Sequence, residues 1–514
     1  MKRRQFIQSL LVGAASSGFA PAFAFTQTES WQQAFDQALL TNPRLLGFKG
    51  TTQDQLVAEA IELEGAIPNG LRGHLYRNGP AQHELGDYRY RHWFDGNGMV
   101  QSFAIDQRGI RHQGKMVATE KDLLERQANK PMFPTFGSVP PDVDSATSAD
   151  QLNAANISML AHHGELLALW EGGSAHVINP TNLATQGIKT WSKEAQGLPF
   201  SAHPRVDPDG TLWNFGYASS AGLLVLWHID AEGKLQKNGI IPLDHMAMPH
   251  DFVVTENHLV IMLPPFHFEP GENSEGRSFL ELHQWHDDRP TRVLVVKKSD
   301  FDDYQYVDLP AQWVFHFGNA WEDLDRVIRF DGASSQNPSV MQTTFREIMR
   351  GETITPSDHS QHYIYEVDTR KGKAKQTLLL PESVSTEFPV IDPRVCGRRY
   401  QRVFCLANTH GKTQDTQGPS IWFNSVMGIN VETGAYDQYT YPTHHMPEEH
   451  LFVPAPNSAP ESQGWVIGTS LDIQQKRTCL NVFDAQNLSA GPLARATLPY
   501  ALPLGLHGKF LLQT

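Results

Sequence analysis

Four histidines stand out in this sequence because each lies inside a short, distinctive phrase and because they are far apart along the chain. They are His203 in SAHPRVDPDG, His250 in MPHDF, His316 in FHFGNAWED and His507 in LGLHGKF. Side chains so widely separated can meet only in a closed fold that returns the chain repeatedly to one axis. Four neutral imidazoles that met there would bind a divalent metal, and imidazole suits iron, copper, zinc or nickel. If the four converge, the sequence predicts a redox or Lewis-acid metal centre.

Short apolar segments rich in Val, Ile, Leu and aromatic residues predict β-strands along most of the chain. Many of them are joined in the same way: a strand ends in Asp, two or three polar residues follow, and Gly precedes the next strand. Because Asp can bond its own turn and Gly supplies a positive φ, each such join predicts a hairpin. The joins lie at 106–109, 207–210, 230–233 and 368–372, and the clearest strands at 165–170, 211–217, 223–230, 258–263, 293–296 and 465–470.

Hairpins follow one another without regular alternation with helices, which predicts antiparallel sheets. In so long a chain, radial repetition leaves few exposed sheet edges, so we expect an all-β propeller, although no blade repeat is visible. Two amphipathic helices interrupt the pattern. One has Trp31, Phe35 and Leu39 on one face, would be capped by Thr26 or Thr28, and would end at Asn42-Pro43; the other carries Met341, Phe345, Ile348 and Met349 and would pack on the sheet or line an apolar passage.

The first 24 residues have the features of an export signal: a basic start, a stretch of small apolar residues, and Ala22-Phe23-Ala24 as a cleavage site. The run 3–7 (RRQFI) resembles the twin-arginine motif, with Lys2 where that motif usually has Ser or Thr. An ordinary secretory signal or a membrane anchor is the alternative, but the apolar stretch is short for a bilayer span. We expect residues 1–24 to be removed and the mature chain to work in a bacterial periplasm.

The composition is that of a large soluble domain. The net charge is -14, and without the three cations of the signal 39 Lys+Arg face 56 Asp+Glu, a balance of -17 that argues against nucleic acid as a partner. Cys396, Cys405 and Cys479 form no CxxC motif and are expected to be small buried hydrophobes. No linker divides the chain, so we expect an N-terminal helical segment at 25–60 and a single propeller domain with cap insertions at 61–514.

Nine phrases of the sequence resemble those of the carotenoid cleavage oxygenases, and they occur in that family's order. They are LRGHLYRNGPA, HWFDGNGMV, LLALWEGG, SAHPRVDPDGTLWNFGY, PHDFVVTENHLVIM, FHFGNAWED, TEFPVIDPR, FVPAP and LPLGLHGKF. The resemblance runs from about Pro68 to the C-terminus. It implies a seven-bladed propeller, one Fe(II) per chain on its axis, and a cap of loops and helices that forms an apolar tunnel. The ligands that it implies are His203, His250, His316 and His507.

The resemblance also implies three glutamates that fix the ligating imidazoles through their second ring nitrogens. Glu171 would pair with His250, Glu387 with His316 and Glu449 with His507, while His203 would have no carboxylate partner. Because Glu448 adjoins Glu449, this last assignment could shift by one residue.

The other polar residues of the recognised phrases are expected to have structural roles. Glu322 and Asp323 would support the cap or a turn, and the run 95–98 (DGNG) is too short for a calcium loop and predicts a turn between strands. The remaining conspicuous histidines are expected to be surface or ordinary polar groups: His162, His163, His283, His286, His444 and His445.

The resemblance implies a non-haem Fe(II) dioxygenase that adds O2 across one double bond of a conjugated apolar alkene and releases two carbonyl products. A carotenoid or apocarotenoid is the expected substrate, and a lignostilbene-type stilbene is the alternative. Stilbene cleavers grip the phenol oxygen with a Tyr and a Lys; no such pair can be placed around 115–121, where Met116 and Ala118 stand. Leu506, where the family commonly has Phe, would reshape the cavity. An apolar patch could make peripheral membrane contact.

Other classes of protein fit the sequence less well. A quinoprotein dehydrogenase would have vicinal cysteines, and a multicopper oxidase would have His-x-His pairs; the sequence has neither. A non-catalytic periplasmic propeller that only binds a ligand would keep the turns without needing the four histidines.

Overall fold

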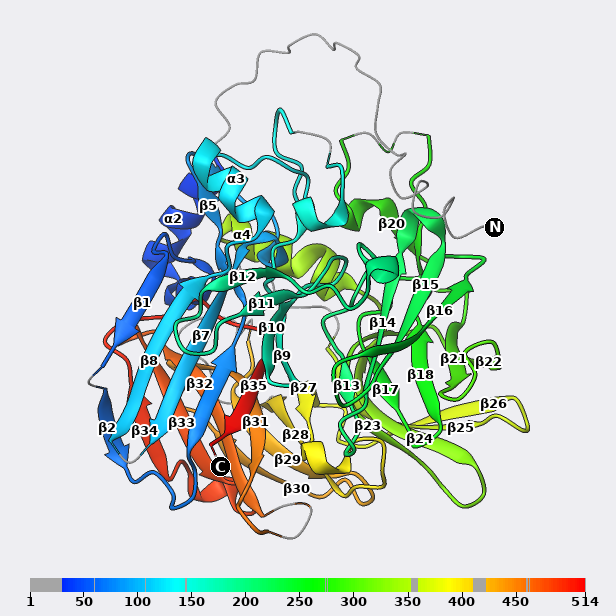
Figure 1. Cartoon of the computed structure of the whole chain (residues 1–514). Coiled ribbons are helices and arrows are strands. Elements are labelled where there is room, and N and C mark those ends of the chain that lie inside the picture. The colour runs from blue at the N-terminus through cyan, green and yellow to red at the C-terminus, as the bar shows by residue number, and fades with distance from the viewer. Residues whose placement is uncertain are drawn as a thin grey trace.

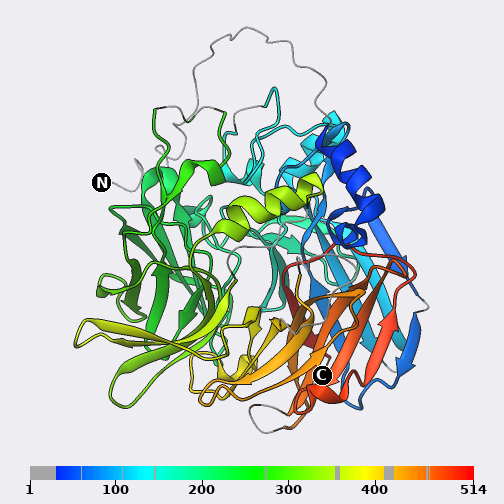
Figure 2. The same ribbon diagram turned by 180° about the vertical axis from the view of Figure 1, so that it is seen from behind.

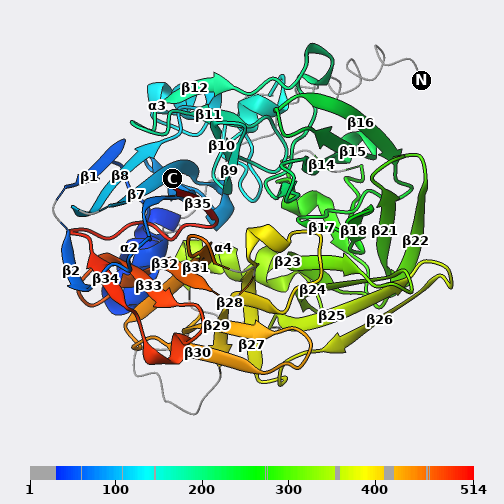
Figure 3. The same ribbon diagram turned by 60° about the horizontal axis from the view of Figure 1, so that its bottom comes forward.

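The structure is a computed structural model that describes residues 30–513 except 60, 107, 144–145, 273, 275, 353–358, 410–421, 459–460 and 462. The expected export signal at 1–24 and the expected helix caps Thr26 and Thr28 lie outside the described residues. Antiparallel sheets stand around one axis, as the view from below shows (Figure 3). The part of the chain that is described forms seven such blades, which confirms the propeller.

The blades follow one another around the ring in chain order (Figure 1). The first contains β1 (Gln55–Ala58), β8 (Gly109–Met116), β7 (Asn97–Asp106), β3 (Gly73–Arg77) and β35 (Gly508–Leu512), with β4 (Pro80–Gln82) beside β7. The second contains β9 (Ser158–His162), β10 (Glu165–Leu169), β11 (His176–Ile178) and β12 (Thr185–Ile188), and the third β13 (Arg205–Val206), β14 (Leu212–Ala218), β15 (Leu223–Ile229) and β16 (Leu235–Pro242).

The remaining blades are built in the same way. The fourth contains β17 (Phe252–Val254), β18 (His258–Leu263), β21 (Thr291–Lys297) and β22 (Tyr304–Leu309), and the fifth β23 (Trp313–Glu322), β24 (Val327–Ser335), β25 (Gln361–Asp368) and β26 (Lys373–Leu378). The sixth contains β27 (Val384–Val390), β28 (Arg402–Thr409), β29 (Ser425–Asn430) and β30 (Tyr436–Thr440), and the seventh β31 (His445–Pro454), β32 (Gly464–Asp472), β33 (Arg477–Asp484), β34 (Ala494–Thr497) and β2 (Glu62–Gly65). Two short ribbons lie outside the blades: β5 (Glu84–Leu85) with β6 (Tyr88–Arg89), and β19 (Phe266–Phe268) with β20 (His283–Trp285).

Strands from the two ends of the chain close the ring. The C-terminal strand β35 pairs with β3, with Gly73 opposite Leu512, and the N-terminal strand β2 pairs with β34, with Glu62 opposite Thr497. Each end therefore completes a blade begun by the other end, and closure leaves few free sheet edges. The pairing of β1 with β8 shows that residues before 60 already belong to a blade.

The four predicted hairpins are confirmed. The turns at 106–109, 207–210, 230–233 and 368–372 join β7 to β8, β13 to β14, β15 to β16 and β25 to β26. In two of them the backbone N–H of Gly210 or Gly233 donates to the carbonyl of the Asp that begins the turn, at 2.8 and 3.0 Å. Both glycines have positive φ, which is why a residue without a side chain is needed there.

Helices cover one end of the ring and form the cap (Figure 1). The helix α2 (Trp31–Thr41) is capped by Ser30 in a box with Gln33, two residues after Thr28 and four after Thr26. The second predicted helix is a π-helical turn at Val340–Thr344 that continues as α4 (Phe345–Arg350), which crosses the cap end of the axis (Figure 2). A third, α3 (Glu120–Ala128), was not expected.

Short 3-10 turns complete the connections between the blades. They are η1 (Pro43–Phe48), η2 (Trp93–Asp95), η3 (Ala149–Leu152), η4 (Lys193–Ala195), η5 (Ser219–Ala221), η6 (Leu280–Leu282), η8 (Pro393–Val395) and η9 (Leu488–Ala490). No helix among the described residues is both long and apolar enough to cross a membrane. The three cysteines all lie in described parts of the chain, where they are free and buried, as predicted.

Candidate metal centre

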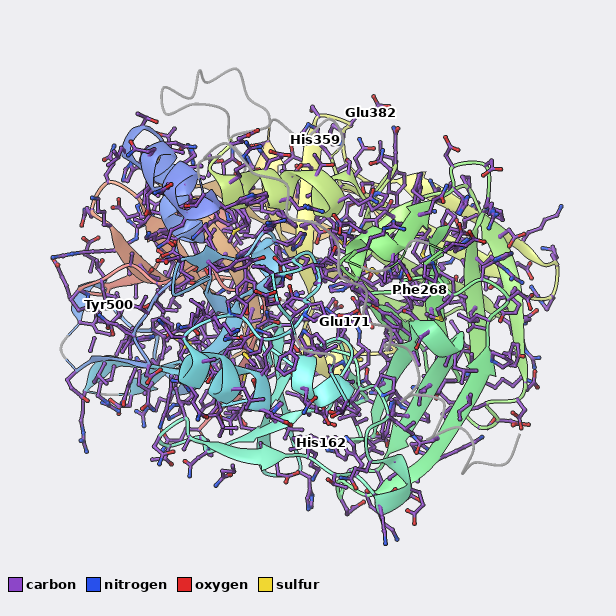
Figure 4. The ribbon with its side chains drawn as sticks, turned by 90° about the horizontal axis from the view of Figure 1, so that it is seen from above. His162, Glu171, Phe268, His359, Glu382 and Tyr500 are labelled. Atoms are coloured by element: carbon purple, nitrogen blue, oxygen red, sulfur yellow. The ribbon has the colours of Figure 1, made fainter. Side chains whose placement is uncertain are left out.

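The seven residues predicted for the metal site come from seven different blades, one from each. In ring order they are His507 before β35, Glu171 after β10, His203 before β13, His250 before β17, His316 on β23, Glu387 on β27 and Glu449 on β31. Six of the seven lie on or next to the innermost strand of their blade, which is the strand closest to the axis (Figure 3). Seen from the cap, Glu171 lies near the middle of the ring (Figure 4). The fold thus brings together residues that span 336 positions of sequence, from 171 to 507.

The four imidazoles converge on one point. Ring centroids of His203 lie 4.6 Å from His250, 5.2 Å from His316 and 4.8 Å from His507, and His316 lies 4.7 Å from His507. The Nε2 atoms of His203 and His250 are 3.1 Å apart. Ring nitrogens of His203, His250 and His316 all lie within 4.8 Å of one another, a spacing that could hold one metal ion.

Carboxylates hold the outer nitrogen of three of these rings, in the predicted pairs. His316 Nδ1 lies 2.6 Å from Glu387 Oε2 and His507 Nδ1 lies 2.8 Å from Glu449 Oε1. His250 Nδ1 lies 3.3 Å from Glu171 Oε1, a longer contact. Among the described residues no carboxylate forms an ion pair with His203.

This arrangement fits a bound metal. When Nδ1–H donates to a carboxylate, the Nε2 lone pair of the neutral ring is left to point toward the axis. Nε2 of His316 is buried and has no hydrogen-bond partner among the described residues, which is costly unless another group satisfies it. Four neutral imidazole donors around one point are suited to a divalent transition ion.

Burial and the neighbouring rings favour the neutral imidazole at two of the four positions. Burial, followed by the neighbouring imidazoles, holds the pKa of His203 and of His316 well below the ordinary value. Burial also lowers the pKa of His250, but Glu171 outweighs it and the net shift is upward. Burial raises the pKa of Glu387 to about 7. A divalent ion at the centre would supply the positive charge that this carboxylate lacks.

β-Bulges aim several of these side chains at the axis. The pairing register shifts between Val314 and His316 in β23, between Glu387 and Val390 in β27, and between Pro447 and His450 in β31. A bulge inserts an extra residue and re-aims the side chains beside it, and such irregularities gather next to active sites. The bulge in β27 also places Phe388 at a positive φ of 55°, directly after Glu387.

The bulge in β31 gives Glu448 and Glu449 different partners. Glu449 contacts His507, while Oε2 of Glu448 lies 3.0 Å from Nη1 of Arg77 and its Oε1 accepts from the backbone N–H of Gly505 at 2.6 Å. Both glutamates are buried. Glu449 is therefore the residue at the centre, and Glu448 holds the loop that carries His507.

A largely aromatic cavity reaches the centre from the cap side. It encloses about 1070 Å³, part of it open to solvent, and His250, His316 and His507 form its floor. Leu506 lines it, as expected, and so does Phe345 of α4, whereas Met341, Ile348 and Met349 of the same helical stripe are buried in the core. The other aromatic lining residues are Trp93, Phe94, Phe315, Phe388, Trp422 and Phe423.

Sequence reasoning did not assign these cavity walls. Trp93 and Phe94 lie in the recognised phrase HWFDGNGMV, which was a usable signal, whereas Trp422 and Phe423 lie in no recognised phrase. Met116 packs in the core of the first blade and does not line the cavity.

A second, more polar chamber, part of whose roughly 1600 Å³ is open to solvent, reaches the imidazoles from the opposite side. His203, His316 and His507 line it together with Arg205, whose guanidinium pairs with Asp251 at 2.7 Å. The centre thus lies between an aromatic cavity and a polar chamber.

Glu322 and Asp323 take structural roles, as predicted. Glu322 accepts from His258 Nδ1 at 2.8 Å and contacts Thr255 and Asn257, so it fixes the turn between β17 and β18. The carboxylate of Asp95, in the run 95–98, accepts from the backbone N–H of Gly137 at 2.9 Å and so holds a neighbouring loop.

Replacing Glu322 with Gln should lower stability without removing metal. Burial acts to raise the pKa of Glu322, but the hydrogen bonds from His258, Thr255 and Asn257 lower it to about 2, from an ordinary 4.5. The stabilisation is thus complete above pH 4.5 and is lost as the pH falls toward 2. We expect E322Q to lose about 1–2 kcal/mol at pH 6, since the turn is partly exposed. Urea unfolding from pH 6 to pH 3 checks this. The difference in unfolding free energy between the wild type and E322Q should shrink as the pH falls. A constant difference would contradict the role of the Glu322 carboxylate in this turn.

Comparisons with known proteins identify the family. The family model "RPE65: Retinal pigment epithelial membrane protein" matches residues 50–512. The chain belongs to the carotenoid cleavage oxygenase family. It is 30% identical over 469 residues to the apocarotenoid-15,15'-oxygenase of Synechocystis, a match that covers 87% of this chain and 92% of that protein.

Two other relatives of this chain have names that refer to aryl alkenes. The isoeugenol monooxygenase of Pseudomonas nitroreducens is 26% identical over 91% of this chain and 97% of its own, and the lignostilbene-α,β-dioxygenase isozyme III of Sphingomonas paucimobilis is 26% identical over 88% and 93%. Membership of this family supports an oxygenase-type enzyme and decides against the quinoprotein and multicopper alternatives.

The solved structures agree with the fold. The cobalt-substituted crystal structure of the Synechocystis apocarotenoid oxygenase superposes with a TM-score of 0.80 at 29% identity, covering 92% of this chain and 99% of that one. That relative is thus a metalloprotein, and the histidine cluster of this chain is consistent with a metal site of its own.

Proposed function

We propose that this protein is an Fe(II)-dependent dioxygenase that cleaves one C=C bond of a conjugated alkene with O2 and releases two carbonyl products. The observation that carries the proposal is the convergence of His203, His250, His316 and His507 at the end of an aromatic cavity. We infer that these four hold one iron and that Glu171, Glu387 and Glu449 orient three of them. When bound, iron(II) supplies the redox chemistry with O2.

The protein's own residues bind, orient and shield the reactants. The aromatic walls offer flat surfaces to a conjugated substrate and exclude water from the bond to be cleaved. Phe388 stacks on His316 with ring centroids 5.2 Å apart, and its ring lies 5.2 Å from that of His507, so it limits how closely a substrate can approach those rings. We propose no acid or base among the cavity residues, because insertion of both oxygen atoms of O2 leaves no proton to be moved.

A carotenoid or apocarotenoid is the first candidate substrate. The cavity opens to solvent and has seven aromatic side chains among its described lining residues, which suits a long apolar polyene of which part would lie outside. Exposed Leu40 on α2 and Leu123 on α3 lie on the cap, where they could contact a membrane that supplies such a substrate. The periplasmic location remains a proposal that rests on residues 1–24.

A hydroxylated aryl alkene, such as a stilbene, is the second candidate, and one feature of the cavity favours it. Polar side chains at or next to the ends of β24, β25, β27 and β28 form a polar part of the cavity wall, where Ser385 of β27 pairs with Asn408 of β28. They are Ser335, His359, Ser360, Ser385 and Asn408. A phenolic hydroxyl could hydrogen-bond to such a wall, whereas a hydrocarbon would leave it unused.

Aerobic turnover of iron-loaded protein tests the function and separates the substrates. We expect paired carbonyl products from a β-apocarotenal or from a hydroxylated stilbene, with one oxygen from ¹⁸O2 in each product, measured by mass spectrometry. Protein that contains one iron per chain and cleaves no conjugated alkene would contradict the proposal.

The variant Asn408→Leu decides what the polar wall does. If the polar wall binds a phenol, the KM for a hydroxylated stilbene should rise about tenfold or more in this variant, while the KM for its methyl ether should change little. The reason is that one hydrogen bond lost in a buried site costs about 1–3 kcal/mol. Equal KM values in the variant and the wild type would remove the support for the second candidate.

A further inference from the structure

A second cluster of metal-binding side chains lies on the ribbon formed by β19 and β20, away from the axial centre. His267, Glu269 and His286 each place one potential ligand atom within 4.8 Å of the other two. His286 Nε2 lies 3.0 Å from Glu269 Oε1. Ligands about 2.0–2.1 Å from a tetrahedral or octahedral ion lie about 3.0–3.4 Å apart, so this pair has the spacing of two ligands of one ion.

The alternation of the ribbon explains why these side chains share a face. In β19 and β20, Phe266 pairs with Trp285 and Phe268 with His283, so these four side chains face inward. His267, Glu269 and His286 alternate with them and face outward. The inward face packs into the cap, where the rings of Phe268 and His283 contact that of Phe279. The ring centroid of Phe279 lies 6.0 Å from that of Phe136, which in turn lies 5.9 Å from that of Phe94 in the cavity wall.

A third imidazole comes from a neighbouring segment. Ala247, between β16 and β17, bridges to His267, and this brings His245 onto the same outward face. The ring of His245 stacks on that of His267 at 5.2 Å, and His286 lies 5.3 Å from His267 on the other side. His245 is exposed and His286 is partly exposed, whereas His267 between them is buried, so solvent reaches the row of rings at its two ends.

A cation already lies among these groups. Arg289 Nη1 is 3.1 Å from His267 Nδ1 and 3.8 Å from Glu269 Oε1, so a lone pair of His267 and the carboxylate both face a positive charge. Burial, followed by His245, His286 and Arg289, lowers the pKa of His267 to about 4, which keeps that ring neutral and able to ligate at neutral pH. The Arg289 side chain is 37% exposed and can turn into solvent.

We propose that His267, Glu269 and His286, with His245 beside them, form a second metal site that binds a divalent transition ion such as Zn²⁺ once Arg289 turns away. Imidazole and carboxylate are established ligands of zinc. A bound ion would cross-link the ribbon to the segment that carries His245 and Ala247, and so stabilise the cap near the cavity. This site is independent of the proposed oxygenase function.

Metal analysis of the full-length protein tests the proposal. Iron-loaded protein is dialysed against Zn²⁺, and both metals are counted by mass spectrometry, with thermal unfolding recorded in parallel. We expect one zinc in addition to one iron, and a higher Tm with zinc than without it. Zinc that enters only by replacing iron, or no zinc at all, would overturn the proposal.

Variants locate the bound ion. H286A and E269Q should lose the zinc and the rise in Tm while they retain iron; E269Q keeps the size of the side chain and guards against a folding defect in H286A. R289A should bind zinc at least about tenfold more tightly, because it no longer has to displace a cation. The matched control is H445A, which alters another cluster of the chain, formed by His444, His445 and Asp472. Zinc that survives in both H286A and E269Q, or that is lost in H445A, would show that the ion binds elsewhere.

Discussion

His250→Ala should purify without bound iron and should cleave no alkene, while the propeller remains folded. His250 precedes β17, and its ring nitrogens lie 3.1 Å from His203 and 3.3 Å from Glu171, while its ring lies 5.3 Å from that of Phe315. The substitution removes one of four proposed ligands and leaves the Glu171 carboxylate buried without its partner. Loss of an outer partner alone typically costs about 10–100-fold in metal affinity, so loss of a ligand should cost more than about 100-fold.

Iron content by mass spectrometry and folding by circular dichroism check this result. The matched control is His162→Ala, since His162 is also buried but lies at the end of β9, apart from Glu171 in Figure 4, and its Nε2 contacts the Gly210 carbonyl. The control should keep its iron. Full iron content in the His250 variant would show that His250 is not a ligand.

Glu449→Gln should weaken iron binding, whereas Glu448→Gln should lower stability, although the two residues are adjacent. Glu449 contacts His507 Nδ1, so the Gln variant should lose about 10–100-fold in iron affinity with little change in stability. Glu448 forms a buried ion pair with Arg77, and breaking such a pair costs about 3–5 kcal/mol. The Glu448 variant should therefore unfold at lower denaturant concentration and still bind iron nearly as well as the wild type.

Iron titration and urea unfolding of both variants separate these effects. Each variant serves as the control for the other, because both replace a buried glutamate of β31 with the same isosteric amide. If Glu448→Gln lost the iron and Glu449→Gln kept it, the partner of His507 would have been assigned one residue out of place.

Much of the fold was predictable because local rules dictate it. Asp and Gly at four strand junctions correctly predicted hairpins. Apolar β-branched segments correctly predicted strands such as β18, whose bounds at His258–Leu263 match the prediction. The helix caps were less predictable: Ser30, which caps α2, lies closer to the helix than the expected threonines. The short helix α3 was missed because its apolar residues, Leu123, Leu124 and the terminal Ala128, are too few to form a stripe at helical spacing.

The sequence by itself determined the chemistry available at the centre: four imidazoles and three carboxylates, each inside a recognisable phrase. Only the tertiary structure decided how they meet, because each comes from a different blade and reaches the axis only when strands from both chain ends close the ring. It also decided between Glu448 and Glu449, since the side-chain direction in a strand reverses at every residue and a bulge shifts that count. The aromatic cavity and the His267 cluster were likewise unreadable from the sequence, because both depend on which strands and loops become neighbours.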